Sequence, residues 1–411
     1  MDSTRRMVLR VLPFLLIGAF GVLLRVHSFE PIHGVGFDEE LYANYVDAVG
    51  QRGLWHYPAI IDLYLKGQSD YPIALLPPTR VTFIVAATAW KTLFGGPAVE
   101  AVRAVSCTAS ILTLLLSGVL AWRMRGRGFA LAVLALVAVA PTQLHMAHRA
   151  LVDGFFGFLT LGTLAALWET LQRPAPAWTW PALYGGALAL LVLTKENAAF
   201  VLVAIVALLI ANRWFRFGTV SQPLIAATIA GSVAGAAILA LCAGGFGPLV
   251  HVFSLDAAKS LQTPYAIATG DGPWFRYLVD LMLVSPAVMI FAIGGAFLLK
   301  REDEIDRAGW FLLGFILFSY VPMSNVTYGL NLRYANMWDF PLRYLALVPV
   351  FRWAAPGASV KGNALIVVLV GGLASSELLN YVDIFVLNPV YDPIPSALMR
   401  ALDILKPLPG Q

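Results

Sequence analysis

The sequence has little charge and almost no cysteine. Charged residues make up only 13% of its 411 residues, whereas 59% are hydrophobic. The two cysteines, Cys107 and Cys242, lie inside apolar segments, which excludes a disulfide framework and a thiolate metal site. We expect both to be packing residues. The net charge of +4 is spread over short loops instead of one basic patch, which argues against a nucleic-acid partner.

Long apolar segments dominate the rest of the chain. The mean hydropathy of +0.75 predicts an all-α, polytopic membrane protein, with about eleven membrane spans. No small-residue cleavage site follows the first apolar segment, so we expect it to be retained as a span. The expected spans cover residues 7–24, 98–122, 129–144, 154–171, 178–193, 198–211, 223–243, 277–299, 309–321, 341–351 and 364–386.

Basic residues in the short loops predict the orientation of these spans. If the N-terminus is cytoplasmic, the arginine-containing loops all fall inside, as the positive-inside rule requires. Residues 28–97 then form one long external loop, with a helix over 37–50 and a second helix, 81–94, along the membrane surface. The predicted organisation is a membrane domain over residues 1–386 and a short external tail over 387–411.

Three adjacent carboxylates follow the first apolar segment, in the run Gly36-Phe37-Asp38-Glu39-Glu40-Leu41-Tyr42. Carboxylates at a membrane boundary are costly to desolvate, so they need either solvent or a function. A water-facing helix start explains them equally well, because acidic residues favour the first turn of any helix. The run alone leaves both interpretations open.

Further motifs lie in the expected external loops or at the external ends of expected spans. They are Pro77-Pro78, Leu93-Phe94-Gly95 followed by Arg103, Arg149-Ala150-Leu151-Val152-Asp153, Leu193-Thr194-Lys195, and Asn331-Leu332-Arg333-Tyr334 with Pro341. Together with the acidic run, and in this order, they resemble the GT-C superfamily of membrane glycosyltransferases, which use polyprenyl-phosphate sugars. More narrowly, the chain resembles the protein mannosyltransferase and aminoarabinose transferase branch, glycosyltransferase family 39. The resemblance extends from the first span to about residue 349.

The acidic run suits the chemistry that this resemblance implies. Sugar transfer from a lipid phosphate needs a base for the acceptor hydroxyl, and a carboxylate beside the sugar can serve in one inverting displacement. Asp38 is the candidate base, and it matches the functional aspartate of the family's Asp-Glu pair. We expect Glu39 to orient the acceptor or to help hold a divalent ion, and Glu40 to be solvated.

Cations near this run are expected to bind the phosphate leaving group, whose negative charge grows in the transition state. The candidates for phosphate binding are Lys195, Arg333, Arg149 and Arg103, and those for other substrate contacts are Tyr42, Asp153 and Tyr334. Lys195 has a plainer alternative, which is a salt bridge with Glu196. Relatives often have glycine where this chain has Glu196, which puts the phosphate geometry at Lys195 in doubt.

The three arginines also have plainer alternatives. Arg149 and Asp153 are four residues apart and can form an ion pair on a helix surface. Arg103 lies early in an expected span, where it needs a partner such as Glu100 or a lipid phosphate. Arg333 can be a solvated loop residue.

His145 and His148 are spaced three apart, which suits two metal ligands on one helix face, although interfacial histidines are commoner. Some relatives depend on a divalent cation and others do not. The resemblance therefore leaves the cofactor undecided.

The sequence predicts a GT-C glycosyltransferase that transfers one hexose or pentose from a polyprenyl-phosphate donor to a lipid, glycan or protein acceptor. The transfer is expected on the non-cytoplasmic face, and a bacterial plasma membrane is favoured. One alternative is a transporter or flippase of a lipid-linked or anionic substrate, which needs charged residues and broken helices near the bilayer midplane. Another is an inactive scaffold that keeps the fold.

Overall fold

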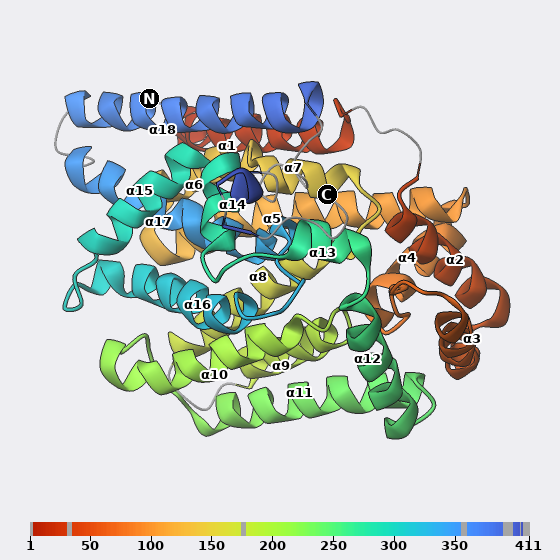
Figure 1. Ribbon diagram of the computed structural model, residues 1–411. Helices are drawn as coiled ribbons and strands as arrows, with labels where there is room; N and C mark the ends of the chain where they lie inside the picture. The colour runs from red at the N-terminus through yellow and green to blue at the C-terminus, as the bar shows by residue number, and fades with distance from the viewer. Residues whose placement is uncertain are drawn as a thin grey trace.

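The computed structural model describes residues 3–30, 35–173, 178–354, 360–388, 398–402 and 404–405 (Figure 1). Within these residues the secondary structure is helical, without a strand, which confirms the all-α prediction. Most of the predicted tail lies outside the described residues, as does part of the first loop, residues 31–34.

Every apolar segment that was expected to span the membrane is helical. The helices are α1 (Ser3–Val26), α5 (Ala98–Arg125), α6 (Arg127–Ala138), α7 (Pro141–His148), α8 (Val152–Leu171), α9 (Thr179–Val192), α10 (Ala198–Phe215), α11 (Gln222–Cys242), α14 (Arg276–Val284), α15 (Pro286–Leu298), α16 (Arg307–Met323), α17 (Asp339–Ala354) and α18 (Val360–Tyr381). In the described part of the chain, five helices are long and apolar enough to cross a membrane, or six if the bent pair α6–α7 counts as one. The predicted number of about eleven is not confirmed, because helices such as α9 and α15 have only 14 and 13 residues.

Two of the expected spans are broken, each at a proline. Helices α6 and α7 meet at an angle of 53°, just before Pro141. Helices α14 and α15 separate at Ser285, just before Pro286. Proline has no backbone N–H and clashes with the preceding turn, which favours a break at these two positions. Pro349, by contrast, lies inside α17 without ending it.

Arg25 of α1 fills the break between α6 and α7. Its side chain is buried and donates hydrogen bonds to the carbonyl oxygens of Val137 at 2.9 Å and Ala138 at 3.1 Å. It also donates to the Ser110 hydroxyl of α5 at 2.9 Å. The α-helical donor to the Val137 carbonyl would come from residue 141, which is a proline. Arg25 therefore joins α1, α5 and α6 by donating to carbonyls at the end of α6, of which that of Val137 also accepts from the backbone N–H of Ala140 at 3.3 Å.

We expect Arg25→Met to destabilise the protein by about 3–5 kcal/mol, because it leaves buried carbonyl oxygens without donors. The apparent melting temperature in detergent should fall by several degrees. Arg52→Met, at an exposed position on the end of α2 (Phe37–Arg52), is the matched control and should leave it unchanged. Equal melting temperatures for the two variants would show that Arg25 does not hold the break together.

Five helices gather at one end of the molecule, on the right in Figure 1. They are α2, α3 (Tyr57–Asp70), α4 (Val81–Phe94), α12 (Phe246–Ser260) and α13 (Pro264–Gly270). The predicted helix over 37–50 is α2, and α4 has the predicted bounds. Helix α4 packs against α2 and α5. Its buried residues, among them Phe83 and Ala87, belong with Tyr42 and Val46 of α2 to a hydrophobic cluster separate from the main core.

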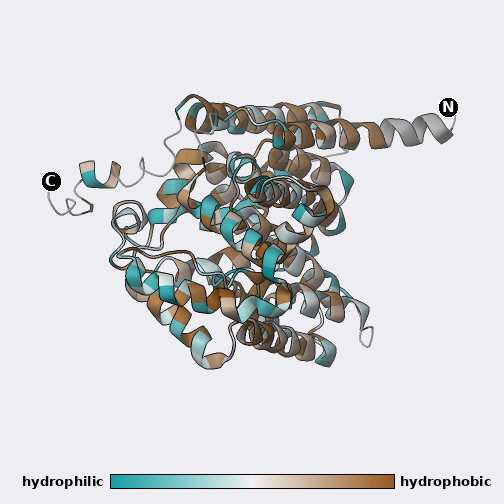
Figure 2. Ribbon diagram, turned by 90° about the vertical axis from the view of Figure 1, so that its right-hand side faces the viewer, coloured by the Kyte–Doolittle hydropathy of each residue, from teal (hydrophilic) through white to brown (hydrophobic). Residues whose placement is uncertain are grey.

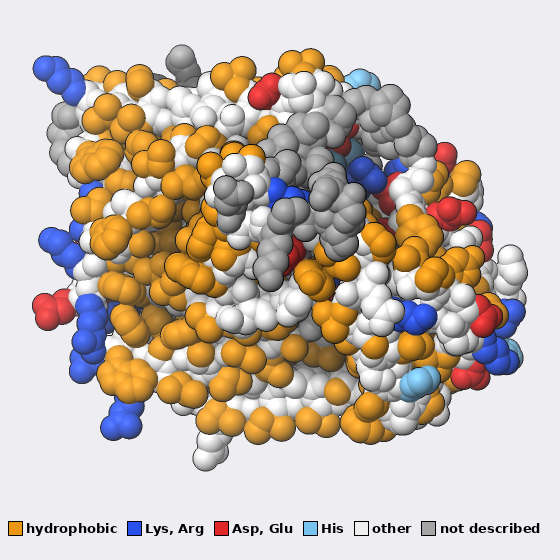
Figure 3. All heavy atoms as spheres, viewed as in Figure 1, with side chains coloured by type: hydrophobic (Ala, Val, Ile, Leu, Met, Phe, Trp, Pro, Cys, Tyr) orange, Lys and Arg blue, Asp and Glu red, His pale blue; other side chains and the backbone are white. Residues whose placement is uncertain are grey.

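Hydrophobic side chains cover the middle of the molecule, and charged side chains gather at its two ends (Figure 3). One end, on the left, carries mainly Lys and Arg, around the connections from α10 to α11 and from α15 to α16. Figure 2 looks onto the other end, where hydrophilic residues are interspersed among the helices nearest the viewer. This distribution is typical of a protein whose helices cross a bilayer and whose two ends are exposed to water.

Candidate active site

A cavity of about 420 Å³ opens beside the N-terminus of α2, and Asp38 lines it. Arg333, Arg149 and His145 also line this cavity, so its wall carries several charges, and Thr263 and Tyr265 form another part of its wall. The Arg333 guanidinium donates a hydrogen bond of 2.9 Å to the Asp38 carboxylate. The Asp38 side chain is 28% exposed, so its carboxylate is accessible from the cavity.

A chain of alternating charges leads from Asp38 into the protein. Arg333 lies between two carboxylates, with its Nε 3.8 Å from Asp153. Asp153 in turn accepts a hydrogen bond of 2.5 Å from the Lys195 ammonium, and both side chains are almost fully buried. The ammonium also lies 3.9 Å from the centre of the Tyr334 ring, close enough for a cation–π contact. The fold thus brings together five predicted site residues from four separate segments.

Lys195 also lines a second hollow, of about 540 Å³, formed by the end of α9 and by α10, α11 and α12. The walls of this groove are almost entirely apolar, with Leu202, Val233, Leu239 and Phe253 among the lining residues. Lys195 and Glu196 are its charged residues. The charge chain therefore connects a charge-lined cavity at Asp38 with an apolar groove at Lys195.

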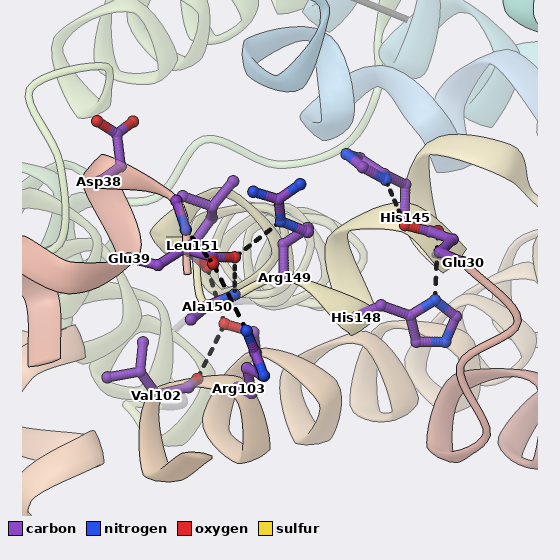
Figure 4. Close-up of polar contacts among 12 residues, drawn as sticks. Glu30, Asp38, Glu39, Val102, Arg103, His145, His148, Arg149, Ala150 and Leu151 are labelled. Carbon is purple, nitrogen blue, oxygen red and sulfur yellow. Dashed lines mark hydrogen bonds and ion pairs between the residues drawn. The ribbon is translucent and has the colours of Figure 1, made fainter. Parts of the chain in front are cut away.

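Glu39 is enclosed by donors and faces away from Asp38 (Figure 4). One carboxylate oxygen accepts from the Arg149 guanidinium at 2.7 Å and from the backbone N–H of Ala150 at 2.9 Å. The other accepts from the backbone N–H of Gly36 at 2.9 Å and lies 3.6 Å from Arg103. Burial by itself raises the pKa of Glu39, but these donors outweigh it, so the pKa lies below its usual value. Glu39 joins α2 to α5 and to the α7–α8 connection.

Two of the alternative ion pairs at the arginines are wrong. Arg149 does not pair with Asp153, because α7 ends at His148 and α8 begins at Val152, so the two residues are not on one helix. Arg103 binds Glu39, not Glu100. Arg333 is not a solvated loop residue, since its side chain is only 16% exposed. Glu40 is exposed, as predicted.

The predicted pair of Lys195 with Glu196 is also wrong. Glu196 forms a salt bridge of 2.9 Å with Arg80, and Lys195 forms one with Asp153. Arg80 is buried at the start of α4, and it also donates to the Tyr42 hydroxyl. Tyr42 is thereby part of a buried network and is not among the residues that line either hollow. The sequence analysis missed Arg80, although an arginine directly before an apolar helix was a visible signal.

The two histidines face a carboxylate that was also missed, Glu30 (Figure 4). His145 lies 2.8 Å and His148 3.3 Å from its oxygens. Burial opposes ionisation of Glu30, but both histidines favour it and lower its pKa to about 2. Among the described residues, no three His, Cys, Asp or Glu side chains are placed to hold a metal ion. The site therefore gives no support to a resident metal.

The fold and the charge chain define a helical membrane protein with a charge-lined cavity joined to an apolar groove. A family model described as dolichyl-phosphate-mannose-protein mannosyltransferase matches residues 73–246, which include Arg103, Arg149, Asp153 and Lys195. Among curated proteins no relative matches the sequence.

Several solved structures share the fold. ArnT from Cupriavidus metallidurans in the apo state has a TM-score of 0.52 and 16% identity, over 98% of this chain and 78% of that chain. The structure of ArnT bound to undecaprenyl phosphate has a TM-score of 0.56 and 16% identity, over 97% and 79%. AglB, the oligosaccharyltransferase of Archaeoglobus fulgidus, in complex with an inhibitory peptide and a dolichol-phosphate, has a TM-score of 0.54 and 14% identity, over 95% and 56%. These matches confirm the predicted resemblance, and the fold is that of the GT-C membrane glycosyltransferases.

Proposed function

We propose that the protein is an integral membrane glycosyltransferase that passes a sugar from a polyprenyl-phosphate donor to an acceptor hydroxyl. The observation that carries the proposal is the charge chain from Asp38 to Lys195, which links the charge-lined cavity to the apolar groove. A donor of this kind has the same three parts in the same order: a polar sugar, a phosphate and an apolar chain.

The groove at Lys195 is suited to the lipid end of such a donor. Its walls are aliphatic and aromatic, and its charged residues are Lys195 and Glu196. With Arg80 holding Glu196, Lys195 is the cation in reach of a phosphate at the mouth of the groove. Two structures with this fold were solved with lipid phosphates, undecaprenyl phosphate in ArnT and dolichol-phosphate in AglB, which supports a donor of this class.

The proposed reaction is a single displacement at the anomeric carbon. The Asp38 carboxylate takes the proton of the acceptor hydroxyl while the hydroxyl oxygen forms a bond to the anomeric carbon from the face opposite the phosphate. The bond from that carbon to the phosphate oxygen breaks, and its electron pair leaves with the phosphate. Arg333 and Lys195 stabilise the charge that develops on the phosphate. The sugar is transferred to the acceptor with inverted configuration at its anomeric carbon.

Glu39 has a positioning role in this proposal instead of a chemical one. Its two oxygens already accept from Arg149, Ala150 and Gly36, so the carboxylate has little capacity left for a substrate proton. By holding Arg149 at the wall of the cavity, it fixes one of the candidate phosphate-binding cations. Arg103 also lies 3.6 Å from the Glu39 carboxylate and helps to hold it in place.

Helix α2, whose first turn holds Asp38, lies at the end opposite to the one where Lys and Arg side chains gather (Figures 1 and 3). Under the positive-inside rule, this arrangement supports a site on the non-cytoplasmic face. We propose the plasma membrane of a bacterium as its location, with the cavity facing the periplasm or the exterior.

We expect Lys195→Met to raise the KM for the donor roughly tenfold or more, because a charge-assisted contact to the phosphate is lost. The single variant also leaves Asp153 without its closest cation. The double variant Lys195→Met/Asp153→Asn removes both charges, so that neither is left buried without its partner. A change in its KM therefore does not result from an unpaired buried charge that destabilises the fold. Steady-state kinetics at varied donor concentration measure the effect. A double variant with the donor KM of the wild type would contradict a phosphate site at Lys195.

The donor class can be tested by incubating the purified protein in lipid with a panel of polyprenyl-phosphate sugars and a membrane fraction as acceptor. Mass spectrometry of the released polyprenyl phosphate identifies the donor. The proposal predicts turnover of at least one member of the panel. Binding of a panel member without any release of polyprenyl phosphate would favour the transporter alternative.

A further inference from the structure

A third hollow, of about 330 Å³, lies at the opposite end of the molecule from Asp38. We call it the arginine hollow, because Arg213, Arg216, Arg301 and Arg307 line it, with Glu302 as its one carboxylate. Trp214 and Phe215 complete the lining. The positive-inside rule explains arginines in a loop at this end but not why they converge on one hollow.

The turn that carries two of these arginines is tightly built. The Asn212 side chain both donates to and accepts from the backbone of Gly218, at 2.9 Å and 3.0 Å, which closes the chain between them into a loop. Within that loop Arg216 has a left-handed backbone, with φ of 52°, which is strained for a residue with a side chain. In this conformation Arg216 lines the hollow, as does Arg213 three residues earlier.

Arg301 joins the α15–α16 connection to the same turn. Its guanidinium donates two hydrogen bonds, of 3.1 Å and 2.8 Å, to the carbonyl oxygen of Trp214. This carbonyl lies in the last turn of α10, where the helix dipole is negative and repels an anion. Because Arg301 binds this carbonyl and Arg307 forms an ion pair of 3.0 Å with Glu304, the positive charge of Arg213 and Arg216 is left for an anion in the hollow.

An apolar path leads from the membrane to the hollow along α10. This helix is one of the candidate spans, so its last turn lies at a membrane surface. Val203, Val206, Ile210 and Trp214 are exposed and spaced three or four residues apart, which places them on one helix face. Such a stripe is suited to acyl chains and offers nothing to a free phosphate ion.

We propose that the arginine hollow binds the phosphate headgroup of an anionic phospholipid whose acyl chains lie along this face of α10. Basic pockets between membrane helices have the charge and depth that lipid phosphates require. The site is independent of the proposed sugar transfer, because it lies at the other end of the molecule.

Native mass spectrometry can test this site with the detergent-purified protein. The probes are phosphatidylglycerol and phosphatidylcholine with identical acyl chains, alone and in the presence of inorganic phosphate. We expect wild-type protein to prefer phosphatidylglycerol, and Arg213→Gln/Arg216→Gln to weaken its binding roughly tenfold or more. Lys361→Gln, an exposed cation on α18 outside the hollow, is the matched control and should bind as the wild type does.

Three outcomes would overturn the proposal. They are equal binding of the two lipids by the wild type, unchanged phosphatidylglycerol binding by the double variant, and displacement of phosphatidylglycerol by millimolar inorganic phosphate. The double variant is expected to fold normally, because neither arginine side chain makes a hydrogen bond or ion pair to the described residues. Its melting temperature without lipid checks this.

Discussion

Replacing Asp38 by asparagine is expected to lower the rate of sugar transfer by roughly 10²–10⁴-fold, the usual contribution of a general base. Asparagine keeps the shape of the side chain and can still accept from Arg333, but it cannot take a proton from the acceptor. The melting temperature should stay close to that of the wild type, because the Asp38 side chain is partly exposed and asparagine can keep the hydrogen bond from Arg333.

The matched control for this variant is Glu40→Gln. Glu40 lies in the same helical turn, is exposed and undergoes the same chemical change. Its transfer rate should remain within about twofold of the wild type, because it contributes neither a base nor a packing contact. Loss of activity in both variants would point to the charge of the acidic run as a whole, and full activity of Asp38→Asn would remove Asp38 from the reaction.

The second large effect is expected at Glu39, and it concerns stability. Glu39→Ala leaves Arg149, Arg103 and two backbone N–H groups without their common acceptor. Loss of one partner from a buried charged cluster typically costs about 3–5 kcal/mol. We therefore expect a clear drop in the apparent melting temperature, together with lower activity because Arg149 is no longer held at the cavity wall.

Glu40→Ala, one residue further along α2, is the control for stability and should melt as the wild type does. Glu39→Gln separates a positioning role from a chemical one. If Glu39 only positions, the activity of this variant should fall together with its thermal stability. A variant that melts normally and is inactive would instead show that the Glu39 carboxylate takes part in the chemistry.

The sequence predicted where the helices lie. It did not predict how long each helix is or how many of them cross the membrane. Apolar runs identify buried or lipid-facing segments whether a helix crosses the bilayer or ends within the protein. The breaks before Pro141 and Pro286 could have been anticipated, since a proline interrupts each run. What could not be read was that Arg25, more than a hundred residues away, would supply donors at the first break.

The site residues were predicted as a set, but their pairing was not. Asp38, Arg333, Asp153 and Lys195 do meet, although they come from distant segments. Reasoning from sequence spacing offered only neighbours as partners, such as Glu196 as the alternative for Lys195, because it had no information on which residues the fold brings close. Arg80, which was not recognised, forms a salt bridge with Glu196, and Lys195 pairs with Asp153 instead.

The most direct test of the proposed function is to measure both products at once, in sealed vesicles that contain the purified protein and its donor. For each polyprenyl phosphate released, one glycosylated acceptor should form, and Asp38→Asn protein in parallel vesicles should form neither at an appreciable rate. Movement of the intact lipid-linked sugar across the vesicle membrane, without release of polyprenyl phosphate, would contradict a glycosyltransferase and identify a transporter.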